Sequence, residues 1–92
     1  MPVEVRIPTI LRKHTGGARA VSSGGSTVRE VFEQIDAEHP GFRSAIVGDS
    51  GDLHRFINVY LNDEDIRFLG SLETPVSEGD TVSILPAVAG GR

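Results

Sequence analysis

The chain has 92 residues, 38% of them hydrophobic and 24% charged, a composition typical of one small globular domain. Lys and Arg number 9 against 13 Asp and Glu, and the resulting net charge of -4 argues against a nucleic-acid binder that neutralises phosphates. There is no cysteine, which excludes disulfides, thiolate metal sites and thiol nucleophiles, and no apolar run approaches the roughly 20 residues of a membrane-spanning helix.

Two strands are predicted at the N-terminal end. Residues 3–7 alternate apolar and polar side chains, which indicates a half-buried strand. The same stretch lacks the apolar centre of a signal peptide, so we expect a cytoplasmic protein. Residues 9–17 are polar and end in two glycines, which favours a long loop. Residues 18–23 alternate again, so we expect them to form a hairpin with the first strand.

One helix is predicted after the glycines at 24 and 25. Ser26 or Thr27 is the expected cap, because residues 27–30 fit a capping box in which a hydroxyl and a glutamate satisfy free amides. Four residues fall on one helical face and predict packing on a sheet: Val28, Val31, Phe32 and Ile35. The helix is expected to end at residues 39–41, which read His-Pro-Gly.

The second half of the chain predicts three more strands. Residues 42–54 combine a short apolar piece with a polar surface loop. We expect a strand at 56–61, a turn at 62–65 that leads into a short strand at 66–68, and a last strand at 81–85. One helix on one face of a mixed sheet is an α+β domain, which we place at residues 1–86, with residues 87–92 as a flexible tail.

No set of residues has the spacing of an active site. Lys13, the single lysine, does not stand beside glycines as in a phosphate-binding loop. The three histidines are far apart and lack the paired spacing of metal ligands. We therefore expect no catalytic residue, no bound metal and no cofactor.

The Gly90-Gly91 pair in the tail has two interpretations. Glycines near a chain end are common and carry no function by themselves. Glycine also lacks a Cβ atom, so Ala89, Gly90 and Gly91 would thread into the narrow active site of another protein and leave a carboxylate open to reaction with ATP. The second interpretation makes the chain a substrate of a partner enzyme.

Several segments resemble the ubiquitin-like sulfur carriers of the ThiS/MoaD type. They are residues 58–67, residues 72–76 and residues 79–91, which include the Gly79-Asp80 turn, the Leu85-Pro86 strand end and the Gly-Gly tail. Residues 5–12 and 53–58 are most similar to the CysO branch, the carriers of cysteine biosynthesis. The resemblance covers residues 3–91 and implies a β-grasp fold.

The resemblance also implies a chemistry and its partners. In this family an E1-like enzyme adenylates the terminal glycine, here Gly91, and sulfur replaces the adenylate to form a thiocarboxylate. The CysO branch implies a pyridoxal-phosphate-dependent cysteine synthase as the sulfur acceptor. Arg92 follows Gly91 and departs from the family pattern. We expect a peptidase of the JAMM zinc type to remove it, unless Arg92 is an added residue.

A docking patch is expected next to the tail. If Ile57, Val59 and Leu61 face the helix, strand alternation turns the residues between them outward. The expected patch consists of Phe56, Tyr60 and Leu85. Arg55 and Arg67 are candidates for its rim, although solvated strand arginines are the simpler interpretation.

Other functions fit the same pattern. A ubiquitin-like modifier would join target lysines through Gly91, and the small subunit of a molybdopterin synthase would use the same tail inside a permanent complex. An unrelated β-grasp interaction module would have no use for the glycines. The sulfur carrier and the modifier both begin with adenylation, so the sequence alone does not separate these two functions.

Overall fold

The computed structural model describes residues 2–49 and 51–86. Five strands form one mixed sheet in the order β2-β1-β5-β3-β4. Their bounds are β1 Val3–Arg6, β2 Ala20–Ser23, β3 Ile57–Leu61, β4 Glu64–Asp65 and β5 Thr81–Pro86. β1 pairs with β2 in the predicted antiparallel hairpin, and β5 lies between β1, to which it is parallel, and β3, to which it is antiparallel.

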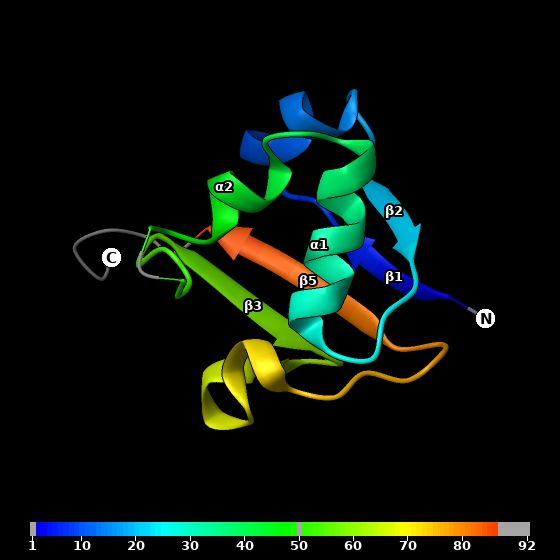
Figure 1. The fold of residues 1–92 in the computed structure, drawn as a ribbon, viewed down its shortest axis with the longest axis vertical. Coiled ribbons are helices and arrows are strands. Elements are labelled where there is room, and N and C mark those ends of the chain that lie inside the picture. Colours follow the sequence, from blue (N-terminus) through cyan, green and yellow to red (C-terminus); the bar gives the residue numbers. More distant parts are fainter. Residues whose placement is uncertain (1, 50, 87–92) are drawn as a thin grey trace.

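The helices cover one face of this sheet. In Figure 1, α1 (Val28–Glu38) crosses in front of β5, and α2 (Phe42–Ile46) lies on the same side. The predicted capping box is present, because Thr27 Oγ1 accepts from the Glu30 amide (3.2 Å) and Glu30 Oε1 accepts from the Ser26 amide (2.8 Å). Thr27 is therefore the N-cap. A mixed sheet with α1 and α2 on one side confirms the predicted α+β architecture. The face turned away from α1 and α2 is the open face of the sheet.

The core lies between the helices and the covered face of the sheet. All four residues of the predicted helical stripe are buried. The predicted inward residues of the strands at 57–61 and 81–85 are buried as well: Ile57, Val59, Leu61, Val82 and Ile84. The rings of Phe32 and Phe42 meet edge to face with centroids 6.0 Å apart, so α1 and α2 are joined through the core.

Three predictions of local structure were wrong or incomplete. Residues 66–68 form a 3-10 helix, η2 (Ile66–Phe68), instead of a strand, because the Asp65 carboxylate accepts from the Arg67 amide (2.9 Å) and turns the chain. Residues 9–17 are not a loop throughout. They contain the 3-10 helix η1 (Thr9–Thr15), which buries Leu11 and Thr15. The unclear segment after residue 41 contains α2, and a third 3-10 helix, η3, spans Ser71–Glu73.

Candidate functional site

The end of β5 sets the place from which the predicted tail leaves the sheet. Leu85 pairs opposite Asn58, and Pro86 pairs opposite Ile57, so β5 ends beside the start of β3. Residues 87–92 follow directly. The predicted tail residues Ala89, Gly90 and Gly91, and the predicted cleavage at Arg92, lie outside the described residues.

The open face of the sheet carries a groove of about 420 Å³ next to this strand end. Tyr60 from β3 and Leu85 from β5 both line it, and 47% of the Leu85 surface is exposed. Pro8 and Ser83 contribute further lining. The structure therefore brings together two of the three residues predicted for the docking patch.

Phe56, the third predicted patch residue, is placed differently. It precedes β3 instead of starting it, and it is 57% exposed. The groove lining does not include it. Phe56 is thus an exposed aromatic side chain at the start of the strand that borders β5, and its membership of the docking patch stays a prediction.

Two arginines that line the groove were not predicted from the sequence. Arg6 stands on β1, and Arg12 stands in η1. The alternation of residues 3–7 was sufficient to turn Arg6 outward, onto the face shared with Tyr60 and Leu85. Arg12 gave no such signal, because the segment around it was interpreted as a loop.

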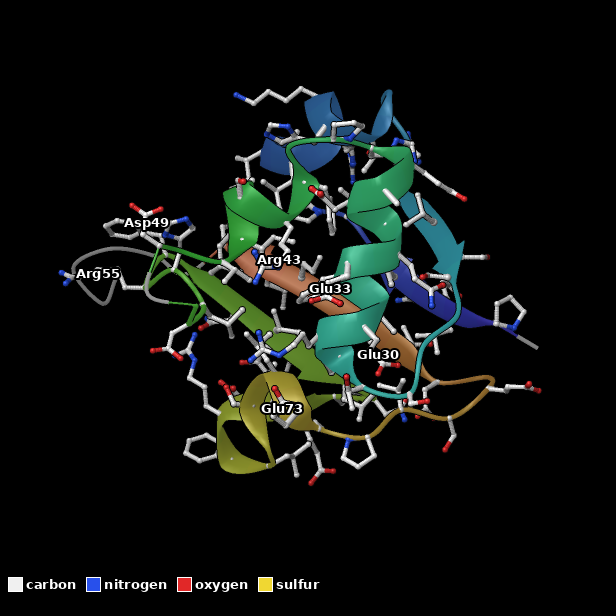
Figure 2. The ribbon with its side chains drawn as sticks, in the orientation of Figure 1. Glu30, Glu33, Arg43, Asp49, Arg55 and Glu73 are labelled. Carbon is white, nitrogen blue, oxygen red and sulfur yellow. The ribbon has the colours of Figure 1, made fainter. Side chains whose placement is uncertain are left out.

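Arg67 has a structural role at the start of β3. Its guanidinium donates to the Ile57 carbonyl (2.7 Å) and to Asn58 Oδ1. β4 pairs only with Tyr60 and Leu61, so the first of these contacts satisfies a backbone carbonyl on the part of the β3 edge that β4 leaves open. Arg67 therefore holds the strand segment that pairs with the last two residues of β5. Arg55 is exposed, and Figure 2 shows it beyond the start of β3.

Residues 2–49 and 51–86 contain no group of three or more His, Cys, Asp or Glu side chains arranged to hold a metal ion. None of the helices in these ranges is long and apolar enough to cross a membrane. His54 Nε2 lies 3.2 Å from the Ser44 carbonyl oxygen.

A protein-family model described as the ThiS family matches residues 5–91. The chain belongs to the ThiS family. It is 52% identical over 93 residues to sulfur carrier protein CysO of Mycobacterium tuberculosis, covering 99% of this chain and all of that protein. The crystal structure of that CysO superposes with a TM-score of 0.90 at 50% identity, over 94% of this chain and 99% of the other.

Two further relatives of this ThiS-family chain bear on partners and on function. One is the crystal structure of the Amycolatopsis orientalis BexX/CysO complex, with a TM-score of 0.89 and 55% identity over 97% of this chain and 99% of the matched chain. The other is small archaeal modifier protein 3 of Haloferax volcanii, 33% identical over 72% of this chain and 71% of that protein. The solved relatives are ubiquitin-like, so the predicted β-grasp fold is confirmed. The family match supports a sulfur-carrier role.

Proposed function

We propose that this chain is a cytoplasmic sulfur carrier, a protein substrate that other enzymes activate and discharge. The observation that carries the proposal is the 52% identity to CysO over essentially the whole length of both proteins. The open sheet face beside the end of β5 supports it, because a carrier needs a docking surface next to its reactive end.

The proposed reaction takes place at the Gly91 carboxyl carbon. A carboxylate oxygen attacks the α-phosphorus of ATP and releases pyrophosphate, which leaves an acyl-adenylate. A sulfide-level sulfur then attacks the acyl carbon and displaces AMP, and the product is a thiocarboxylate. The E1-like enzyme supplies the ATP site and the catalytic groups, while this chain supplies the acyl group and the docking surface. Glycine at positions 90 and 91 keeps the Gly91 carbonyl accessible.

Processing and delivery complete the proposed cycle. With Arg92 attached, the Gly91 carbonyl is an amide and has no carboxylate oxygen to adenylate. A JAMM-type peptidase that hydrolyses this amide would produce the reactive form. The nucleophilic thiocarboxylate sulfur then displaces the leaving group from the β-carbon of an activated serine held by a pyridoxal-phosphate-dependent cysteine synthase. Hydrolysis of the acyl–sulfur bond would release cysteine and restore the Gly91 carboxylate.

The proposed docking patch makes Tyr60 a suitable position for a binding test. Its side chain is half-buried on the open face and lines the groove. Tyr60→Ala should weaken binding to the E1-like enzyme while the far-UV circular dichroism spectrum stays unchanged. Phe56→Ala measures whether the patch extends beyond the groove. Wild-type affinity in the Tyr60 variant would refute the assignment of the docking patch.

Intact mass spectrometry tests the carrier function. The full chain is incubated with ATP, sulfide and the host E1-like enzyme, with and without the peptidase. We expect loss of Arg92 followed by the mass increase of an oxygen-to-sulfur exchange. A matched control that lacks Gly91 and Arg92 should fold normally and gain no sulfur. If the wild-type mass never changes after trimming, the chain is not a sulfur carrier.

A second function is favoured by the similarity to small archaeal modifier protein 3. Under this alternative, the activated Gly91 carbonyl forms an isopeptide bond with a lysine of another protein. Digestion of cell extracts would then yield target peptides that carry the tail residues on a lysine. Such adducts would support the modifier function. If they are absent from cells that form the thiocarboxylate, only the carrier function remains.

A further inference from the structure

The groove on the open face is basic, although the chain as a whole is acidic. Two guanidinium groups line it, those of Arg6 and Arg12, against a single carboxylate, that of Asp63. The net charge of the whole chain is -4. In the part of the chain that the structure describes, neither arginine forms an ion pair with Asp63. Arg6 pairs instead with Glu4, whereas Arg12 forms no ion pair within residues 2–49 and 51–86, so the positive charge of Arg12 is the one left unpaired beside the groove.

The guanidinium groups also have donors to spare. Arg12 Nε donates to the Ile7 carbonyl (3.2 Å), which fixes the side chain and uses one of its five N–H groups. Arg6 Nε lies 3.5 Å from Glu4 Oε2, and 65% of its side chain is exposed. Within residues 2–49 and 51–86, no acceptor engages the terminal nitrogens of either side chain. A pre-positioned guanidinium with free terminal nitrogens is suited to a two-point contact with a carboxylate.

Apolar surface lies beside these donors. Tyr60, Leu85 and Pro8 line the same groove, and Leu85 is nearly half exposed. A partner segment that matches this surface carries an apolar side chain and a carboxylate next to each other. The apolar group would cover Tyr60 and Leu85, and the resulting loss of water would strengthen the charged hydrogen bonds.

We propose that the groove receives an Asp or Glu side chain of the activating enzyme, bound by Arg12 and Arg6 while a neighbouring apolar side chain of that enzyme packs on Tyr60 and Leu85. This inference rests on the proposed carrier function and specifies how the partner is recognised. Arg12 provides most of the affinity, because its Nε bond holds it in place and the residue is already partly buried. Arg6 is more exposed and contributes mainly to the rate of encounter.

The test measures binding of the full chain to the host E1-like enzyme by titration calorimetry, at low and at high salt. Arg12→Gln should raise Kd by about tenfold, whereas Arg6→Gln should raise it by about two- to threefold. Arg12→Lys keeps the charge but loses the forked geometry, so an intermediate Kd is expected. Both Gln variants should bind with a weaker salt dependence than the wild type. The matched control is Arg43→Gln, because Arg43 lies on α2 at the helical face (Figure 2).

The outcomes separate this inference from the carrier function. If the wild type forms the thiocarboxylate but Arg12→Gln and Arg6→Gln bind as the wild type does, the inference is overturned and the carrier function stands. If Arg43→Gln weakens binding as much as Arg12→Gln, the loss of affinity is a general effect of the net charge, and the proposed contact in the groove is overturned. If the wild type self-associates in sedimentation experiments and Arg12→Gln abolishes this, a second copy is the occupant and the inference fails. Arg6 stands on an exposed strand position, so its variant remains informative even if Arg12→Gln unfolds the protein.

Discussion

Replacing Asn62 by alanine removes both a backbone preference and a side-chain bridge at the turn between β3 and β4. Asn62 (φ 49°) and Asp63 (φ 76°) both adopt left-handed conformations, as the two central residues of a tight hairpin turn require. Asn62 Oδ1 accepts from the Thr81 amide (2.9 Å), and Nδ2 donates to Asp80 Oδ1 (3.0 Å). The side chain thereby ties the turn to the start of β5.

The expected loss of stability has two parts. The two hydrogen bonds are exposed, so together they contribute about 1 kcal/mol. Alanine tolerates the left-handed region less well than asparagine, which costs about 1 kcal/mol more. Asn62→Ala should therefore lower the free energy of unfolding by about 2 kcal/mol, a shift of about 1 to 2 M in the urea midpoint. Asn62→Gly loses the hydrogen bonds but accepts the backbone conformation, so its loss should be about 1 kcal/mol.

Urea denaturation followed by circular dichroism measures both variants. Equal midpoints for Asn62→Ala and Asn62→Gly would show that the left-handed backbone makes no contribution. Midpoints equal to the wild type for both would refute the role of the bridge as well. Thiocarboxylate formation by folded Asn62→Gly should match the wild type, because Asn62 is not among the residues that line the groove and glycine accepts the same backbone conformation.

Three further changes test other parts of the structure. Thr27→Ala removes the helix cap and should cost about 1 kcal/mol in urea unfolding, whereas Thr27→Ser should be close to neutral. Phe42→Ala leaves a cavity between α1 and α2 and should cost about 3 to 5 kcal/mol, and a cost below 1 kcal/mol in thermal unfolding would contradict the core packing. Arg67→Met removes the donors to the start of β3 and should speed hydrogen exchange of the Ile57 amide several-fold. Arg55→Met, at an exposed arginine, serves as its control and should leave that exchange unchanged.

Periodic segments predicted the fold well. The alternation at residues 57–61 put Ile57, Val59 and Leu61 into the core, because a strand with one buried face must alternate. The stripe and capping box around Thr27 likewise located α1. These signals are local in the sequence, because each follows from the regular repeat of a strand or of a helix.

Non-periodic segments could not be interpreted in this way. Leu11 and Thr15 are the buried residues of η1, and nothing in the polar stretch around them shows that the core lies beneath. Asp65 ends β4 because its carboxylate accepts a single hydrogen bond from the Arg67 amide. Strand propensities do not predict such a side-chain contact. The groove was only partly predicted, because Arg6, Arg12, Tyr60 and Leu85 come from four separate elements. Tyr60 and Leu85 were proposed from alternation, which also turns Arg6 outward, whereas the place of Arg12 depends on tertiary packing.

The central position of β5 links recognition to the completion of folding. The last described strand inserts between β1 and β3, so the first and last parts of the domain meet only when the sheet closes. Arg6 and Leu85 therefore share one groove only in a finished domain. A nascent chain or a fragment without β5 would expose β1 and β3 as unpaired edges and present no complete groove. An activating enzyme that binds this groove would consequently discriminate against incompletely folded carriers before it spends ATP on them.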